Sequence, residues 1–120
     1  MILKIIPVPK PRMVKSDAWR KRECVIRYWK YKADLESLTR NVGYRIDGSL
    51  CNVVFVLPMA KSWSKKKKAE HEGKPHQNKP DLDNLIKAFQ DCLCKEDSYI
   101  HTIDNVKKVW GYEGAIILDL

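Results

Sequence analysis

The stretch from residue 81 to residue 93 constrains the fold more than any other part of the chain. Its apolar side chains follow the spacing of a helix with one buried face, and they are Leu82, Leu85, Ile86, Phe89 and Leu93. Pro80 disfavours helix at the residue before it, so the helix is predicted to start near Asp81, whose side-chain oxygen is a candidate cap. One face of this helix is therefore expected to lie on the protein core.

The opposite face of the same helix carries charge. Asp83 and Lys87 lie four residues apart, one helical turn, and Asn84 and Asp91 lie beside them. The start of the helix thus concentrates two carboxylates, Asp81 and Asp83, near one cation. This happens within a chain whose formal net charge is +8.

The remaining pattern predicts four strands and one further helix. The strands are expected at residues 2–8, 50–57, 102–110 and 114–120, with a hairpin turn between the last two at Gly111 and Gly114. The other helix is expected to run from Ser16 or Asp17 to about Leu38, and its predicted buried residues are Trp19, Val25, Ile26, Trp29 and Ala33. The order β-α-β-loop-α-β-β predicts an α+β fold. It is a single domain over residues 1–120, with a mixed, roughly four-stranded sheet and two helices packed on it.

Composition and length fit a soluble globular domain. The chain has 120 residues, of which 44% are hydrophobic and 32% charged. Its apolar runs are far too short to cross a bilayer, and prolines interrupt the N-terminal region where a signal peptide would need an apolar segment. We therefore expect a cytoplasmic protein with no membrane partner.

A lysine-rich loop at about residues 59–80 precedes the acidic helix. Its lysines are Lys61, Lys65, Lys66, Lys67, Lys68, Lys74 and Lys79. This concentration of positive charge favours a polyanionic partner, although a solvated surface is the alternative. Because long irregular loops in compact domains are mostly functional or mobile, we expect a flexible clamp on the substrate. Trp63 within it either stacks on a base or anchors the loop.

The four cysteines (Cys24, Cys51, Cys92 and Cys94) form no CxxC pair, so they favour reduced thiols over a disulfide or zinc ribbon. A zinc site from His71, His76, Cys92 and Cys94 has spacings that fit no standard pattern.

The acidic helix start suits metal-assisted hydrolysis of a phosphodiester. Mg²⁺ prefers a few carboxylates plus water, and Asp81 and Asp83 supply two of them. A third is expected from the turn after the helix, from Glu96 or Asp97, with Asp104 as a further alternative. Lys87 is a candidate for contact with the scissile phosphate, the alternative being a surface ion pair with Asp83 or Asp91.

The string Asp81-Leu82-Asp83-Asn84-Leu85-x-Lys87-Ala88, followed by Glu96-Asp97-Ser98, resembles the signature of the RusA family of Holliday-junction resolvases, with phage and prophage members. The resemblance extends from about Val53 to the C-terminus, through Met59–Lys67 and Gly73–His76. It implies catalytic roles for Asp81, Asp83, Lys87 and Asp97, with the three aspartates as metal ligands and Glu96 as the neighbouring acid. The connection before Glu96 is shorter than in the family, so Glu96 and Asp104 stay open as third ligands.

The resemblance and the residue chemistry together predict a Mg²⁺-dependent endodeoxyribonuclease, with Mn²⁺ as a substitute, that resolves four-way junctions by paired symmetric cuts in recombination and repair. Paired cuts imply a homodimer, and the family implies a bacterial or phage-encoded, nucleoid-associated protein. The expected DNA contacts are the loop lysines named above together with Arg12, Lys15, Arg20, Arg22, Trp63 and His76. The alternatives are a nuclease for other branched DNA or RNA, and a nucleic-acid-binding module without catalysis.

Overall fold

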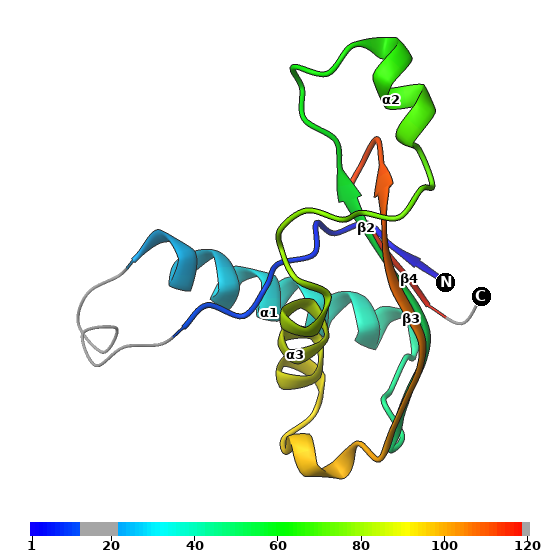
Figure 1. Cartoon of the computed structure of the whole chain (residues 1–120). Helices are drawn as coiled ribbons and strands as arrows, with labels where there is room; N and C mark the ends of the chain where they lie inside the picture. Colours follow the sequence, from blue (N-terminus) through cyan, green and yellow to red (C-terminus); the bar gives the residue numbers. More distant parts are fainter. Residues whose placement is uncertain (13–21, 119–120) are drawn as a thin grey trace.

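The computed structural model describes residues 1–12 and 22–118 (Figure 1). Its elements in chain order are β1 (Ile2–Leu3), α1 (Glu23–Val42), β2 (Ser49–Pro58), α2 (Lys65–His71), α3 (Leu82–Leu93), the 3-10 turn η2 (Asp97–Tyr99), β3 (Thr102–Gly111) and β4 (Ala115–Leu118). The strands form one mixed sheet in the order β1-β4-β2-β3. The predicted α+β class and four-stranded mixed sheet are confirmed.

The central strand β2 separates β3 from β4. It pairs with β3 in parallel and with β4 antiparallel, so the predicted hairpin between the last two strands is wrong. The chain instead leaves β3 at Gly111 and crosses the end of β2 to reach β4. A Cβ atom at Gly111 would lie 2.3 Å from Cγ1 of Val56, so only glycine fits the crossing.

A pair of asparagines bends the two parallel strands at the same level. Asn52 of β2 and Asn105 of β3 both have left-handed backbones, with φ of 56° and 51°, and the Asn105 amide donates to the Asn52 side-chain oxygen at 2.8 Å. Because side chains alternate along a strand, Leu50 and Val53 would otherwise point to opposite faces. Both are fully buried, so the bend keeps them on the core side.

Both long helices lie on one side of the sheet (Figure 1). As predicted, α3 begins after Asp81, and it buries Leu85, Ala88, Phe89 and Cys92. The ring of Phe89 meets that of Phe55 in β2 edge to face, with centroids 5.8 Å apart. This contact seats α3 on the middle of the sheet.

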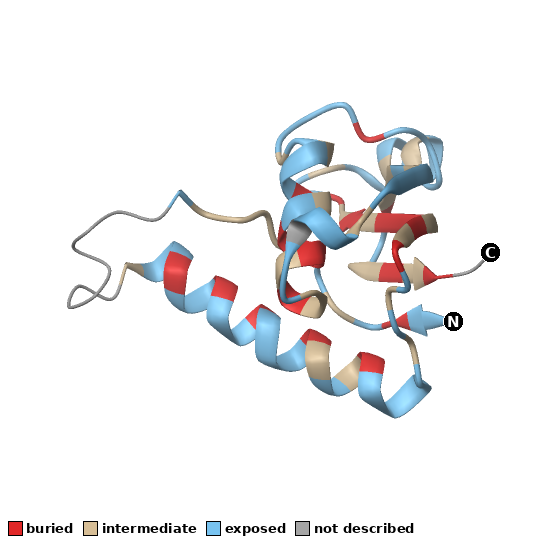
Figure 2. Cartoon of the chain, turned by 90° about the horizontal axis from the view of Figure 1, so that it is seen from below, coloured by how far each residue is buried: buried red, intermediate tan, exposed pale blue. Residues whose placement is uncertain are grey.

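The buried stripe of α1 differs from the prediction. It contains Val25, Tyr28, Tyr31, Leu35 and Thr39, which Figure 2 shows along one side of the helix. Of the predicted residues that the structure describes, only Val25 is buried; Trp29 is 48% exposed and Ile26 45%, and Ala33 is exposed as well. Successive residues lie about 100° apart around a helix, so Trp29 does not share the inward side that Tyr28 and Tyr31 occupy. The predicted start at Ser16 or Asp17, and Trp19, lie outside the described residues.

The first predicted strand is shorter than expected. Only Ile2 and Leu3 pair with β4, while the following segment, with Ile5 and Val8, packs against the core as extended chain. The prolines at 7 and 9 explain this, since proline has no backbone N–H to donate to a sheet.

The basic loop is also more ordered than predicted. It contains the helix α2, which begins after Ser64, whose hydroxyl accepts a hydrogen bond from the Lys67 backbone N–H at 3.2 Å. We call residues 59–72 the arm; Figure 1 shows it beyond the ends of β2 and β3. Residues 73–80, the return segment, then run along the edge of β3 to the start of α3. Backbone hydrogen bonds join them to Lys108 and Trp110 of that strand.

The left-handed asparagine pair yields a test of the bend. We predict that Asn52→Val lowers the free energy of unfolding by about 1–3 kcal/mol, because a β-branched residue resists this backbone and the amide bond is lost. Asn52→Gly is the matched control, since it keeps the backbone conformation and loses only the amide bond. Urea unfolding of the three proteins measures the effect, and equal losses in both variants would contradict the proposed role of the backbone.

Candidate functional site

The two aspartates at the start of α3 are exposed to solvent. Asp81 occupies the N-cap position, yet its side chain makes no capping hydrogen bond. Asp83 lies in the first helical turn, where the helix dipole favours a carboxylate. Capping therefore does not account for Asp81, and both carboxylates face solvent where a cation or a substrate can reach them.

Lys87 lies one turn further along the same exposed face. Within the described part of the chain, no ion pair joins it to Asp83 or to Asp91. The predicted alternative, a surface pair along the helix, is therefore not formed. Asp91 instead pairs with Lys10, and its carboxylate is largely buried. Asp91, which was predicted on the charged face away from the core, is thus mostly enclosed, and its ion pair holds the N-terminal segment on α3.

A groove of about 510 Å³ opens beside Asp81. Its lining is mainly cationic and proline side chains with one carboxylate, contributed by Pro7, Pro9, Lys10, Arg27, Lys79, Pro80, Asp81 and Asn84. The N-terminal segment, α1, the return segment and α3 all meet here. Because Lys10 is already paired with Asp91, the groove offers Arg27 and Lys79 to a phosphate backbone that passes Asp81 and Asp83, which we call the acid pair.

The turn that carries Asp97 lies away from this pair within one chain. Asp97 begins η2, which follows the C-terminal end of α3, and Glu96 precedes it. Because α3 has twelve residues, it is about 18 Å long, and the turn η2 follows its far end, as the chain trace after α3 in Figure 1 shows. Asp104 is four residues before Lys108, which contacts the return segment, so it lies about 13 Å back along β3. Among the described residues no three acidic, histidine or cysteine side chains form a metal-binding group.

The arm is built on a cluster of aromatic rings. Trp63 packs on Trp110 of β3 with ring centroids 4.8 Å apart, and His71 and His76 complete the cluster. The Lys67 ammonium lies 4.1 Å from the Trp63 ring centroid. Of the two alternatives for Trp63, the structure supports the anchor.

His76, which was predicted to contact DNA, lies in the return segment and packs inward on β3. Its side chain is only 5% exposed, its ring stacks on Trp110 at 4.1 Å, and its Nδ1 lacks a hydrogen-bond partner in the described structure. Burial, with a smaller contribution from the nearby Lys108 ammonium, lowers the pKa of this imidazole. His76 is therefore a neutral packing residue.

The remaining predicted DNA contacts lie on the surface. Exposed lysines are Lys61, Lys65, Lys66, Lys67, Lys74 and Lys79, and Lys68 is partly buried. Arg12 is exposed, and its carbonyl accepts a hydrogen bond from the Arg22 guanidinium at 2.7 Å. Arg20 and Lys15 lie outside the described residues.

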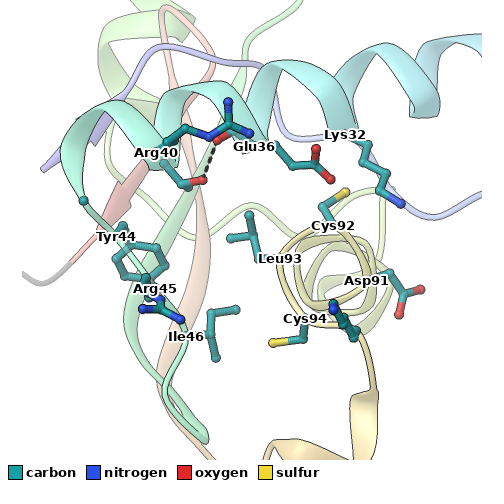
Figure 3. Close-up of a pocket in the computed structure, with 13 residues that line it drawn as sticks. Lys32, Glu36, Arg40, Tyr44, Arg45, Ile46, Asp91, Cys92, Leu93 and Cys94 are labelled. Carbon is teal, nitrogen blue, oxygen red and sulfur yellow. Dashed lines mark hydrogen bonds between the residues drawn. The ribbon is translucent and has the colours of Figure 1, made fainter.

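A second cavity, of about 690 Å³, lies at the other end of α3 (Figure 3). It is bordered by the C-terminal half of α1, the segment around Tyr44 and the end of α3 with Cys92 and Cys94. Burial raises the pKa of the Cys92 thiol to about 11, so it stays protonated at neutral pH. The predicted free cysteines are confirmed. The two histidines of the zinc alternative lie in the arm and the return segment, so they do not meet these cysteines.

A protein-family model described as endodeoxyribonuclease RusA matches residues 4–117, nearly the whole chain. The chain belongs to the RusA family. No curated protein and no solved structure matches it. The family assignment confirms the resemblance carried by the Asp81–Ala88 string. RusA membership makes the protein a nuclease of the Holliday-junction resolvase type and branched DNA its class of substrate. None of the described helices has the length and apolar character needed to cross a bilayer.

Several residues of this RusA site were missed by the sequence interpretation. Lys10 and Arg27 border the groove, Trp110 supports the arm, and Lys108 contacts the return segment. Each reaches the site through contacts between distant parts of the chain, which local periodicity does not report. A local signal was present only for α2, since Ser64 directly before the lysine run is a typical N-cap.

The buried imidazole predicts a pH-dependent arm. His76 of the return segment packs on the same Trp110 ring as Trp63 of the arm, and in this packed state its pKa lies below its usual 6.5. The protein with this ring cluster open therefore binds more protons as the pH falls. The arm is therefore predicted to be most stable above pH 6.5 and to open more often below it. Amide hydrogen exchange in α2 measures this, compared at each pH with His76→Phe, which keeps a ring on Trp110 but cannot be protonated. Parallel exchange in the two proteins from pH 7.5 to 5 would contradict the prediction.

Proposed function

We propose that this RusA protein is a Mg²⁺-dependent, structure-selective endonuclease that resolves four-way DNA junctions. It acts as a homodimer that cuts two strands of like polarity, in recombination and repair in the cytoplasm. The observation that carries the proposal is the exposed pair Asp81 and Asp83, with Lys87 one turn away, in a chain of the RusA family.

The acid pair fits a hard divalent cation. Its oxygens face solvent, Asp81 has no capping bond, and two carboxylates plus water match the ligands that Mg²⁺ prefers. Asp81 and Asp83 would hold the ion, which when bound supplies Lewis-acid stabilisation and an activated water for hydrolysis. Mn²⁺ has the same ligand preference and is the expected substitute.

The protein's own cations orient the DNA. Lys87 lies on the same helix face as Asp83, where its ammonium can contact the scissile phosphate and the charge that develops on it. Arg27 and Lys79 in the groove contact neighbouring phosphates, and the arm lysines contact a more distant part of the junction. These contacts read backbone shape rather than base sequence.

A second copy of the chain supplies the third carboxylate. Asp97 and the acid pair lie at opposite ends of α3, too far apart for ligands of one ion at about 2.1 Å. In a two-fold dimer, Asp97 of one protomer can approach the acid pair of its partner, and the same contact then forms twice. This arrangement gives two sites related by symmetry, as paired cuts require.

The central prediction concerns Asp83. We expect Asp83→Asn to lower cleavage of a labelled mobile four-way junction in Mg²⁺ by at least about 100-fold, because a metal-binding oxygen loses its charge. Binding of the junction should change little, because the phosphate contacts remain. Gel-resolved cleavage and a binding titration of both proteins provide the measurement.

Asp34→Asn is the matched control, because this exposed acid of α1 lies outside the groove and the acid pair. Equal cleavage by wild type and Asp83→Asn would contradict catalysis at this pair. Binding without cleavage by either protein would favour the non-catalytic module. Preferred cutting of flaps, linear duplex or RNA by the wild type would favour the other nuclease alternatives.

A heterodimer experiment tests the shared site. Co-expressed chains carrying Asp83→Asn and Asp97→Asn should form a heterodimer with one intact site, which nicks one strand, whereas both homodimers are inactive. The reciprocal control pairs a wild-type chain with a chain carrying both substitutions. That heterodimer should be inactive if Asp97 acts on the partner's site. The opposite result, an active control and an inactive mixed pair, would place all three acids in one chain.

A further inference from the structure

Lys108 is a lysine on the core-facing side of the sheet. In the parallel pairing of β2 and β3, it lies opposite Phe55, whose side chain is fully buried. Val106, two residues earlier and therefore on the same face, packs against the core. A charged side chain at such a position needs its donors satisfied, because removing an ammonium from water is costly.

The Lys108 ammonium satisfies this need with two backbone carbonyls. It donates to the oxygens of Asn78 and Pro80, each at 2.6 Å. The backbone carbonyl of Lys108 also accepts a hydrogen bond from the His76 N–H at 3.1 Å. One residue of β3 thus holds the return segment at His76, Asn78 and Pro80. Of these three, Pro80 directly precedes Asp81.

We propose that Lys108 is a positioning residue for the acid pair, an inference that rests on the proposed function. It acts through the Pro80 carbonyl, fixing where the chain enters α3 and hence the direction of the Asp81 carboxylate. Two ligands spaced by one residue bind a small ion tightly only when the backbone that carries them is held. Residues that orient metal ligands commonly alter metal affinity by about 10–100-fold when replaced.

A direct phosphate contact is the competing role for Lys108. The geometry favours positioning, because two short hydrogen bonds already orient the ammonium toward the return segment and the side chain is partly buried. The neighbouring Lys107 provides the contrast. It is exposed, and it points to the opposite face of the sheet, since successive strand residues alternate.

The test compares Lys108→Met with the matched variant Lys107→Met, and with Lys108→Arg, which keeps donors for the two carbonyls. We expect Lys108→Met to raise the Mg²⁺ concentration for half-maximal junction cleavage by about tenfold or more. Lys107→Met should change this Mg²⁺ concentration by no more than about twofold. Lys108→Arg should bring it most of the way back to the wild-type value. Junction binding without divalent metal should be nearly equal in all four proteins, because no phosphate contact is removed.

Two readouts do not need cleavage. Mn²⁺ affinity from the paramagnetic resonance of the free ion should fall in Lys108→Met. Backbone amide resonances of residues 78–84 should shift in Lys108→Met without metal, and stay in place in Lys107→Met. Unchanged resonances and unchanged Mn²⁺ affinity would overturn the proposal. So would a loss of junction binding as large as the loss of cleavage at saturating Mg²⁺, since that result identifies a phosphate contact.

Failure of the proposed function gives a different result. In that case the wild type itself cleaves no junction with Mg²⁺ or Mn²⁺, whereas the amide resonances still report whether Lys108 holds residues 78–84. If the wild type cleaves and Lys108→Met matches Lys107→Met in every readout, only the role of Lys108 is wrong.

Discussion

The edge-to-face contact between Phe55 and Phe89 supports the arrangement of the whole molecule. Both rings are fully buried, one at the centre of β2 and one at the centre of α3. α3 has one strongly apolar face, and Phe89 on that face packs on the sheet. The opposite face of the helix therefore points to solvent. Asp83 and Lys87 therefore face solvent as a consequence of core packing. Among the described residues, no ion pair along the helix holds Asp83 or Lys87, so core packing alone orients this part of the charged face.

The sequence predicts the parts of this structure that depend on neighbouring residues. The start of α3 follows from Pro80 and Asp81, and its buried face follows from a spacing that only a helix explains. The predicted hairpin fails because strand order depends on β2, which lies about sixty residues away from that turn and inserts between β3 and β4. The buried side of α1 fails for a similar reason. Two tyrosines and a tryptophan are equally suited to burial, and only the sheet they meet decides which of them turns inward.

The candidate site divides in the same way. The acid pair and Lys87 lie within seven residues of one another, so the sequence brings them together. Lys10 contacts Asp91 across the fold, and Lys108 contacts Pro80 across 28 residues of chain. A local sequence pattern therefore predicts neither contact. The third predicted ligand, Asp97, is near Asp81 neither in the sequence nor in the fold of one chain. One chain separates Asp97 from Asp81 by the length of α3, and only the dimer of the proposed function would bring two such ends together.

The attachment of the arm to β3 changes how a basic loop can act. A flexible clamp would lose conformational entropy when it closes on DNA, whereas rings packed on Trp110 have already lost it in the free protein. The same strand holds the return segment through Lys108, so the arm lysines and the acid pair share one rigid support. On the proposed function, their separation is then fixed before DNA binds. In that proposal, the preferred substrate is one whose backbone brings phosphates to both places at once. Under the proposed function, selectivity for DNA shape would then follow from the fixed attachment to β3 rather than from closure of a loop.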